Sequence, residues 1–532
     1  MRYIKSRRFV SLVLAFVFCI GLAVIPHENV NPVSAANGNN HVVRVGMYVA
    51  TTTDSRLFSA KTDSSNGFEI GVSGGKSFTK LFSLNHTSIF ILPHVNSDFQ
   101  NGNFVPNDNG NIGAYSEFVS IHDNFATANA KANSMGGFVA VVKGGYEVRI
   151  NPSNSSLGKN RSPIGGGLMV TDANGKILLT FEDTSRKFAL RAQNGGSVSF
   201  PMVHRTGAVN TYDYMGFFEY SISEGRLFMI NCIGLEDYTK CVMANEIGTN
   251  VSVETRKAFA VLARTVPMNK KHGDKGFDVC CNSACCQVYK GLHQMSAENN
   301  AIVESTNGLY CAYQGAPISV LYHNSNGGAS CSSVAAWGGN EIPYLTTVFL
   351  DESGESDKWS HEFTKQEFYE YIGSRYIFDA ISDDEISMKI LEKDPYGSDY
   401  ITVLSVSDGS GNTVEVRTSE DVRSACGFDS ANFDISYSSS VLTVNSEGKV
   451  ETQNVAGVLT ADGYKEFDGF TEDYKTTQGV SVSPDKIIIN GQGVGHGVGF
   501  SAVGSEQLAK DGYGYEYILQ FFFNGTTLKS VG

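Results

Sequence analysis

Apolar and polar residues alternate along much of the chain with the period of two that is typical of β-strands. This alternation predicts strands in "HVVRVGMYVATT", residues 41–52, and in "GFEIGV", residues 67–72. The stretch "GLMVTDANGKILLTFED", residues 167–183, predicts a hairpin that turns at 173–175. Between residues 112 and 151 the pattern predicts a strand, an alanine-rich helix and a second strand.

Helical periodicity joins the strand pattern in the second half of the chain. Residues 217–248 predict a strand followed by a short helix, and residues 253–265 predict a helix with one apolar side. Other segments predict short strands within 310–350, a strand coupled to a helix at 413–428, and helices at 363–372, 384–393 and 516–523. The mixture predicts an α+β protein of two or more domains.

Five glycines occupy every second position in "IIINGQGVGHGVGFS", residues 487–501. This spacing excludes the common phosphate-binding loops, which need G-x-G-x-x-G or G-x-x-x-x-G-K-[ST]. A period of two predicts a strand with the glycines on one face and His496 on the other. Glycine on a strand face indicates close approach of a ligand or of another backbone, so a ligand surface and a packing contact both remain open.

The N-terminus carries the pattern of a secretory signal. Arg2, Lys5, Arg7 and Arg8 precede an uncharged run over 9–25, and "NPVSAANG" offers a cleavage site after Ala35. The apolar run is short for a membrane span, and an uncleaved anchor is the alternative. Loss of residues 1–35, with four basic and one acidic side chain, changes the net charge from −14 to −17. So acidic a protein is a poor partner for nucleic acid.

Four of the ten cysteines crowd into "DVCCNSACCQVY", as Cys280, Cys281, Cys285 and Cys286. Cysteines of an exported protein usually form disulfides, but such crowding is more typical of a metal or thiol site. Without Cys19, in the signal segment, nine cysteines remain. An odd number leaves at least one thiol unpaired or bound to a metal.

Six blocks of sequence between residues 210 and 527 resemble, in the same order, the SpoIID/LytB family of peptidoglycan proteins. They are "INCIGLEDYTKCVMANEI", "ETRKAFAVLARTVPM", "DVCCNSACCQVYKG", "YHNSNGGAS…AAWGG…PYL", "VRSACGFDSANFDI" and "GQGVGHGVGFSAVGSEQLAKDGYGYEYIL". The resemblance implies a lytic transglycosylase that cleaves peptide-stripped glycan strands, as in engulfment during sporulation. Other relatives are binding proteins that enhance a cell-wall amidase, which is the alternative function.

The resemblance places the family's catalytic glutamate at Glu246, in "VMANEIG". Ala244, Asn245 and Ile247 replace the usual proline, serine and methionine of that block. One carboxyl group is enough for this reaction, because the C6 hydroxyl of the muramic acid attacks its own C1 and forms a 1,6-anhydro ring. Glu246 would act as acid and then as base, for which an apolar pocket should raise its pKa. Glu236 and Asp237, in "GLEDY", are interpreted as charges at a helix N-terminus.

The same blocks suggest residues that contact the glycan. Arg264, in "LARTV", would hold the lactyl carboxylate or position Glu246, and an ion pair with Glu254 is the structural alternative. The other candidates are Tyr322, His323 and Ser325 in the "YHNSNGG" loop, and His496 in the glycine stretch. There the glycines would line the glycan groove, while Phe500 and Ala502 replace the family's methionine and glutamine.

The family's zinc pattern, C-x4-H-C-Q, falls on the cysteine-rich block. Cys280 takes the cysteine position and Cys285 the histidine position, so the resemblance implies a structural zinc on these two residues. A disulfide between Cys280 and Cys285 or between Cys281 and Cys286 is the alternative. No H-E-x-x-H motif supports a metallopeptidase.

The domain prediction combines these observations. Residues 1–35 are the signal peptide or anchor, residues 41–200 a smaller α+β region, and residues 210–532 a β-rich SpoIID/LytB-like domain with short helices. Within the first region, residues 112–151 resemble a SPOR-type glycan-binding repeat. The expected protein is exported to the cell wall or anchored in the membrane. Its expected partners are peptidoglycan glycan strands, a cell-wall amidase and other engulfment proteins.

Overall fold

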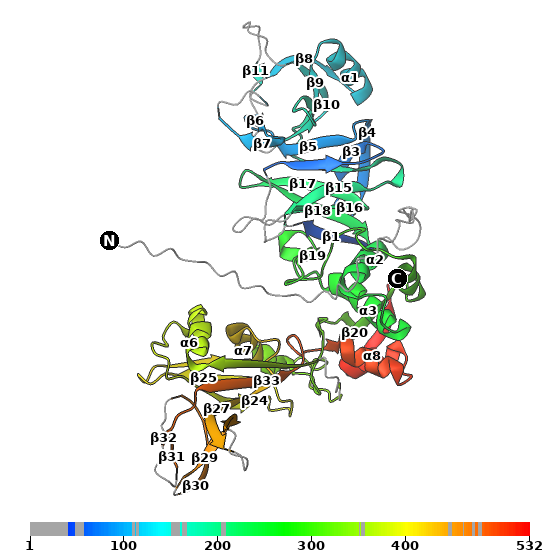
Figure 1. Ribbon diagram of the computed structural model, residues 1–532. Coiled ribbons are helices and arrows are strands. Elements are labelled where there is room, and N and C mark those ends of the chain that lie inside the picture. The colour runs from blue at the N-terminus through cyan, green and yellow to red at the C-terminus, as the bar shows by residue number, and fades with distance from the viewer. Residues whose placement is uncertain are drawn as a thin grey trace, which may run out of the picture.

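The computed structural model describes residues 41–47, 58–108, 112, 116–150, 160–161, 167–203, 209–350, 352, 357–444, 450–460, 462–470, 474–476 and 481–531. The predicted signal segment, residues 1–35, lies outside them. No helix within these ranges is long and apolar enough to span a membrane. The molecule is elongated, with a strand-rich lobe at one end, a group of helices in the middle and a second strand-rich part at the other end (Figure 1).

A seven-stranded sheet forms the part of the first lobe next to the helices. Its order is β19 (Val279–Cys280), β1 (Val42–Met47), β18 (Arg226–Gly234), β17 (Phe217–Ser223), β14 (Lys187–Ala192), β3 (Phe68–Ser73) and β4 (Phe78–Leu84). β1 is almost fully buried between β18, antiparallel to it, and β19, parallel to it. The sheet therefore joins the start of the described chain to the cysteine-rich block.

A ten-stranded sheet completes the lobe. Its order is β11 (Asn160–Arg161), β8 (Ser116–His122), β10 (Gly145–Ile150), β9 (Phe138–Val142), β13 (Ile177–Phe181), β12 (Leu168–Asp172), β5 (Ser88–Pro93), β2 (Ala60–Asp63), β15 (Val198–Val203) and β16 (Val209–Tyr214). The two sheets contact each other through aromatic side chains, as where Phe200 lies 5.2 Å from Phe218 between ring centres. The predicted hairpin is confirmed as β12 and β13, with Gly175 in the left-handed conformation that the turn requires.

The segment 112–151 contains the predicted strand and helix, as β8 and α1 (Phe125–Ser134). Asn124 begins the helix, because its side chain accepts a hydrogen bond of 3.0 Å from the Thr127 amide. The predicted final strand is a hairpin, β9 and β10, because the chain reverses at Gly144 with φ of 104°.

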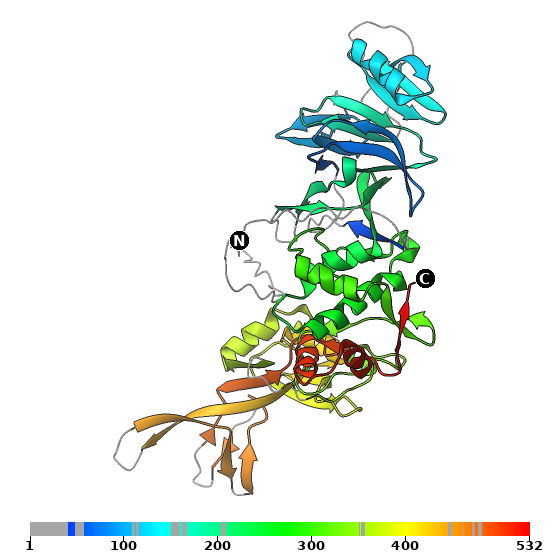
Figure 2. The ribbon, with the colours of Figure 1, turned by 90° about the vertical axis from the view of Figure 1, so that its right-hand side faces the viewer.

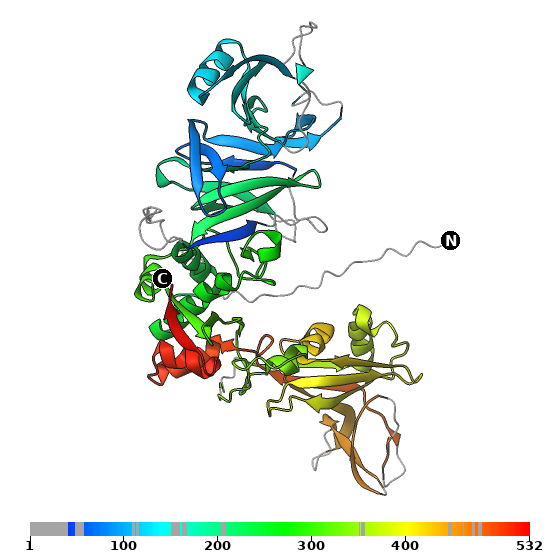
Figure 3. The same ribbon diagram turned by 180° about the vertical axis from the view of Figure 1, so that it is seen from behind.

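The helices in the middle pack around α3 (Val253–Thr265), which has the predicted bounds and is buried over most of its length. Around it lie α2 (Leu235–Glu246), α4 (Ala297–Ser305), α8 (Ala502–Lys510) and α9 (Tyr515–Phe522). The last strand, β35 (Thr527–Ser530), pairs with β20 (Leu309–Tyr313). The C-terminal helices thus return to the middle of the molecule, and seen from behind they lie beside the helices that follow the first lobe (Figure 3).

The second strand-rich part is an excursion between these helices. One sheet has the order β23 (Lys358–Thr364), β33 (Lys486–Gln492), β27 (Phe433–Val444) and β28 (Val450–Val455), and another has β24 (Ser387–Lys393), β25 (Ile401–Ser407) and β26 (Thr413–Arg417). Helices α6 (Lys365–Gly373) and α7 (Ser419–Cys426) pack on these strands. β27 and β28 project from the body as a long hairpin, in orange (Figure 2).

Two predictions for this part are wrong. Residues 384–393 were expected to be a helix, but most of them form β24, which pairs with β25 and has its first two residues buried. The glycine strand ends at Gln492, and the next four alternate glycines all have positive φ. They form a loop that packs on the protein: a Cβ at Gly497 would lie 2.3 Å from the Tyr400 ring, and one at Gly499 would lie 2.4 Å from the Leu321 carbonyl oxygen. The glycines are therefore needed for internal packing.

Candidate functional site

Glu246 is the last residue of α2, and two hydrogen bonds hold its carboxyl group. Oε1 accepts one of 2.6 Å from the Val288 amide and one of 2.9 Å from the Tyr322 hydroxyl. Within the described ranges, Oε2 has no hydrogen-bond partner. The described protein therefore fixes one oxygen of the carboxyl group and not the other.

The surroundings of Glu246 shift its proton affinity in opposite directions. Burial raises the pKa of the carboxyl group. The pKa is lowered, to a smaller extent, by the bonds from Val288 and Tyr322 and by the nearby charge of Lys290, so the net pKa is raised. Burial disfavours the ionised form because water is excluded, while the donors and the cation favour it. A carboxyl group in this balance can release and take up a proton closer to neutral pH than an exposed glutamate.

Tyr322 belongs to β22 (Tyr322–His323), a two-residue strand parallel to β34 (Phe500–Ser501). Its ring lies edge-on to Phe259 of α3, with 5.1 Å between ring centres. Burial raises the pKa of its hydroxyl well above the ordinary value, so Tyr322 remains a hydrogen-bond donor. The predicted site residues Glu246 and Tyr322 are thus in direct contact.

Arg264 forms a hydrogen bond with neither Glu246 nor Glu254, the two residues that the sequence suggested as its neighbours. It is fully buried, and its guanidinium forms a two-pronged ion pair with Glu236, at 2.7 Å for each bond. It also donates to the carbonyl oxygens of Leu309 and Val303. The expected alternative partner, Glu254, instead accepts from Lys257 and from the Tyr515 amide. Arg264 of α3 therefore ties together α2, α4 and the start of β20, and it forms no hydrogen bond with Glu246.

His323 and His496 lie together, but not with Glu246. Their ring centres are 5.6 Å apart, and Trp337 lies 5.4 Å from His496. Successive side chains of a strand point to opposite faces, so Tyr322 turns toward Glu246 while His323 turns away. Ser325 is fully buried, and its hydroxyl has no partner in the described part of the chain. Of the five candidate glycan contacts, the structure brings only Tyr322 to the acid.

The histidine pair is uncharged at neutral pH. Burial lowers the pKa of His323 to about 3, with a further contribution from His496. Burial also lowers the pKa of His496 to about 4. His323 Nδ1 contacts the Val498 carbonyl oxygen at 3.2 Å, and His496 Nδ1 accepts from the Val498 amide at 3.0 Å. These contacts fix the glycine loop against β22.

The cysteine-rich block contains a four-residue cluster rather than the predicted pair. Potential ligand atoms of His272, Cys280, Cys285 and Cys286 all lie within 4.8 Å of one another. His272 Nε2 is 3.3 Å from Cys285 Sγ and 3.4 Å from Cys286 Sγ, and the two sulfur atoms are 4.0 Å apart. Tetrahedral zinc with ordinary Zn–S and Zn–N bonds places its ligand atoms about 3.5–3.8 Å apart, so the cluster fits this ion.

One thiol of this cluster favours the metal-binding form, although the bond to Cys286 and burial raise the pKa of its partner Cys280. A hydrogen bond from Cys280, aided by His272, lowers the pKa of Cys286, and a thiolate is the form that binds zinc. Among the described cysteines no disulfide is formed. Both disulfides considered above are therefore absent from the described fold, and Cys281 lies outside the four-residue set.

The metal cluster and Glu246 share one short segment of chain. Cys285 and Cys286 are followed by Gln287, which accepts a 3.0 Å hydrogen bond from the Tyr238 hydroxyl, and then by Val288, whose amide binds Glu246. When Cys286 is held in the cluster, the Val288 amide two residues later is therefore held as well, and this amide donates to Glu246.

Sequence reasoning missed several members of this arrangement. His272 lies eight positions before Cys280 in "NKKHGDKGF", without a spacing that marks it as a ligand. Cys286 was expected as half of a possible disulfide with Cys281. The Val288 amide could not be found from side-chain chemistry, because any residue except proline supplies such a donor.

Comparisons with known proteins agree with the resemblance. The family model described as "Stage II sporulation protein" (SpoIID) matches residues 223–313, which include Glu246, Arg264 and the cysteine cluster. The "Amidase enhancer" of Bacillus subtilis (strain 168) is 28% identical over 310 residues, 55% of this chain and 40% of that protein. The "Stage II sporulation protein D" of the same organism is 23% identical over 318 residues, 56% of this chain and 75% of that protein. The chain therefore spans less than half of the amidase enhancer.

Proposed function

The chain is a member of the SpoIID/LytB family through residues 223–313, with a role related to the cell wall, and on that premise we propose that it is a peptidoglycan lytic transglycosylase. The observation that carries the proposal is the carboxyl group of Glu246. It has a raised pKa, one oxygen held by Val288 and Tyr322, and a second oxygen without a protein partner.

The proposed reaction uses Glu246 twice. Protonated Glu246 gives its proton, from Oε2, to the oxygen that joins N-acetylmuramic acid to N-acetylglucosamine, and the C1–O bond breaks. The resulting carboxylate takes the proton of the muramyl C6 hydroxyl, whose oxygen bonds to C1 and closes a 1,6-anhydro ring. No water is consumed and Glu246 is protonated again. Tyr322 and Val288 stabilise the carboxylate between the two steps, because both donate to Oε1.

The proposed metal is a structural zinc held by His272, Cys280, Cys285 and Cys286. When bound, it would supply a rigid cross-link between the end of the first sheet and the segment before Val288. The residues of the chain then hold the acid: Val288 donates to it, and Gln287 accepts a hydrogen bond from Tyr238. The metal takes no part in the proton transfers.

The second candidate function is a peptidoglycan-binding protein that enhances a cell-wall amidase. Two observations favour it: the relative named "Amidase enhancer" and the replacements at Ala244 and Asn245 next to the acid. Asn245 donates to carbonyl oxygens of Cys241 and His293, so it is committed to the protein. Under this proposal the same surface binds glycan, and a partner amidase performs the catalysis.

Several further predictions stay proposals. They are export through residues 1–35, with or without cleavage, a place in sporulation, and glycan binding by the SPOR-like segment 112–151. The domain limits 41–200 and 210–532 also remain proposed, and β1, β18 and β19 of one sheet come from both sides of the boundary between them.

The experiment that separates the two functions uses glycan strands stripped of peptides by an amidase. The mature protein should release fragments that end in 1,6-anhydro-N-acetylmuramic acid. The Glu246→Gln variant should bind the strands but release no such fragments. If the wild type releases none, and wild type and Glu246→Gln stimulate a purified amidase equally, the enhancer function replaces the transglycosylase.

A further inference from the structure

Gln287 is a fully buried side chain to which the proposed reaction assigns no part. It lies between the cysteine cluster and Val288, the residue whose amide holds Glu246. Its Oε1 accepts a hydrogen bond of 3.0 Å from the hydroxyl of Tyr238, in α2. A buried amide has a donor end as well as an acceptor end to satisfy, so the position of Nε2 decides what else Gln287 does.

The donor end of Gln287 faces Tyr322. Nε2 is buried and makes no close hydrogen bond within the described ranges. Burial raises the pKa of the Tyr322 hydroxyl well above its ordinary value, and the Gln287 side chain opposes this rise as a hydrogen-bonding group. Only a donor lowers the pKa of a phenol in this way, and Nε2 is the only donor of the side chain. Gln287 therefore lies between two tyrosine hydroxyls, with its acceptor toward one and its donor toward the other.

These hydrogen bonds form a chain that runs in one direction. Burial raises the pKa of Tyr238 well above its ordinary value, so its hydroxyl keeps a proton and donates it to Oε1 of Gln287. This bond fixes which end of the amide is turned to Tyr322. With a donor facing its oxygen, the Tyr322 hydroxyl directs its own proton to Oε1 of Glu246, at 2.9 Å.

At Glu246 the chain meets a second donor on the same oxygen. The Val288 amide donates to Oε1 at 2.6 Å. An oxygen whose two lone pairs both accept hydrogen bonds has no place for the acid proton, which is left to Oε2. We infer that Gln287 is a positioning residue, which acts through Tyr322 to keep the acid proton of Glu246 on Oε2. The inference rests on the proposed function, in which this proton passes to the glycosidic oxygen.

The charged and titratable groups around Glu246 do not supply this direction. Lys290 acts through its charge, which lowers the pKa of the carboxyl group. Tyr238 is also near enough to interact with the charge of Glu246, but its hydroxyl is committed to Gln287. A charge acts on both oxygens of a carboxyl group, whereas a hydrogen bond acts on one. Within the described ranges, the Val288 amide and the chain through Gln287 are what distinguish Oε1 from Oε2.

The test is Gln287→Met, which keeps the length and bulk of the side chain but removes both polar ends. The Tyr322 hydroxyl then loses the donor that polarises it and donates less strongly to the carboxylate. The pKa of Glu246 should therefore rise by roughly 0.3–1 pH unit. In glycan cleavage, kcat should fall about two- to tenfold. KM should stay unchanged, because a fully buried side chain does not touch the glycan.

The pKa of Glu246 can be measured without any substrate. Infrared difference spectra between each protein and its Glu246→Gln counterpart isolate the C=O stretching band of the protonated carboxyl group, which is followed with pH. Tyr322→Phe supplies the decisive background. Because Gln287 acts through the Tyr322 hydroxyl, Gln287→Met should cause no further shift there. An equal shift in both backgrounds, or no shift in either, would overturn the positioning role.

Asn231→Leu is the matched control in the core. Asn231 is another fully buried amide that accepts from a tyrosine hydroxyl, that of Tyr289. The Tyr289 ring stacks on Tyr238, with 5.4 Å between ring centres. The control therefore loosens the same group of rings without removing the chain to Glu246. It should lower stability, as Gln287→Met does, and leave the pKa of Glu246 unchanged.

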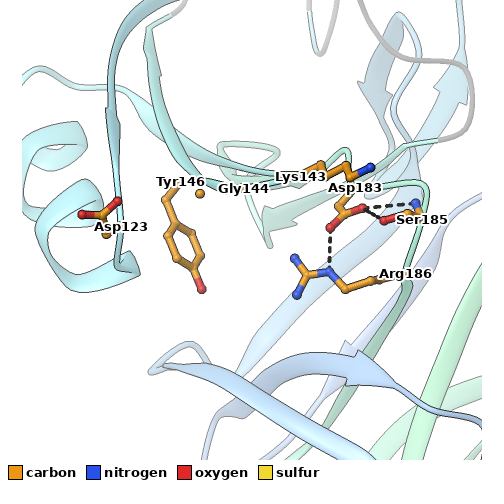
Figure 4. Close-up of a pocket in the computed structure, with 8 residues that line it drawn as sticks. Asp123, Lys143, Gly144, Tyr146, Asp183, Ser185 and Arg186 are labelled. Atoms are coloured by element: carbon orange, nitrogen blue, oxygen red, sulfur yellow. Dashed lines mark hydrogen bonds and ion pairs between the residues drawn. The ribbon is translucent and has the colours of Figure 1, made fainter.

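A second control lies at the end of the first lobe away from α2 (Figure 1). In a surface pocket of about 470 Å³, Arg186 Nε donates to Asp183 at 2.6 Å (Figure 4). Arg186→Gln changes this side-chain pair and should also leave the pKa of Glu246 unchanged. A shift in either control as large as that of Gln287→Met would show general loosening of the fold and would overturn the role of Gln287.

The outcome can be separated from that of the proposed function. If the wild type releases no anhydro products, but Gln287→Met shifts the pKa of Glu246 only where Tyr322 is present, the positioning of the proton stands and the transglycosylase fails. If anhydro products are released and the pKa of Glu246 is the same with and without Gln287, the transglycosylase stands and the role of Gln287 fails.

Discussion

The two sides of β22 show what a buried titratable group needs in order to exchange protons. On one side Tyr322 contacts Glu246, and on the other His323 contacts His496. All four groups are largely enclosed. Burial raises the pKa of Glu246 toward neutrality, whereas it lowers those of the histidines to about 3 and about 4, away from it.

The opposite pKa shifts of Glu246 and the histidines follow from the opposite charges of their ionised forms, and hydrogen-bond donors to Glu246 limit its shift. A carboxyl group and an imidazole both become neutral on burial, but only the carboxyl group then carries a proton that it can give to a ligand. Val288 and Tyr322 limit the rise for Glu246, so its ionised form stays accessible. Under the proposed function, the Glu246 side performs catalysis and the histidine side holds the shape of the glycine loop.

The largest effect is expected from Glu246→Gln. Loss of the titratable proton should slow the release of anhydro products roughly 10²- to 10⁴-fold while the fold stays intact. Asp237→Asn is the matched control, because Asp237 is a partly buried carboxyl group in the first turn of the same helix. Initial rates on stripped strands measure both. Equal losses in the two variants would remove the special role of Glu246.

The cysteine cluster supports the Glu246 side, so removing a ligand should weaken it. The purified protein should hold about one zinc per chain, and Cys286→Ser should lose it, together with about 3 kcal/mol of stability. Cys281→Ser, a change in the same block but outside the cluster, should retain the metal. Elemental analysis and thermal unfolding check this. Retention of the metal by Cys286→Ser would contradict the assignment of a zinc site to this cluster. Absence of metal from the wild type with its cysteines reduced would also contradict it.

The histidine side should appear in the pH dependence of stability. Because the pKa of His323 is lowered to about 3 in the fold, the unfolded chain takes up the proton first, below its ordinary value near 6.5. The stabilising contribution is thus complete above pH 6.5 and is lost as the pH falls toward 3. His323→Gln should reduce the slope of unfolding free energy by about 1.4 kcal/mol per pH unit in that window. Denaturant unfolding from pH 7 to pH 4 measures it, and an unchanged slope would show that His323 is not buried as described.

The smallest effect is expected from Tyr322→Phe. The Tyr322 hydroxyl lowers the pKa of Glu246, so its loss should raise that pKa further. Since the acid must be protonated, activity falls as the pH rises through its pKa, and the alkaline limb of the rate profile should move up by roughly one pH unit or less. A shift to lower pH would mean that the hydroxyl does not donate to the carboxylate.

The sequence predicts the fold best where one period runs over many residues. The α3 helix was found with its bounds, because its apolar side repeats over 13 residues. Residues 384–393 were assigned wrongly, since short apolar runs fit helix and strand alike. The alternate glycines have the period of a strand, but their positive φ angles are set by the close approach of Tyr400 and Leu321.

For the site, the sequence supplied residue types but not contacts. Glu246 was identified by resemblance, and its partner Tyr322 lies 76 positions away along the chain. Arg264 was an attractive ligand for a carboxylate, but its carboxylate proves to be that of Glu236. His272 was missed because it is brought to the cysteines by tertiary packing rather than by spacing. Such contacts depend on the meeting of distant segments, which no local pattern encodes.

The proposed reaction requires that the muramyl C6 oxygen, and not water, replaces the leaving group. Digestion of stripped glycan strands in ¹⁸O-labelled water, followed by mass spectrometry of the fragments, tests this directly. We expect new ends that are lighter than a reducing end by one water molecule, that contain no ¹⁸O and that do not form with Glu246→Gln. Reducing ends that contain ¹⁸O would show attack by water and would contradict the proposed transglycosylase reaction.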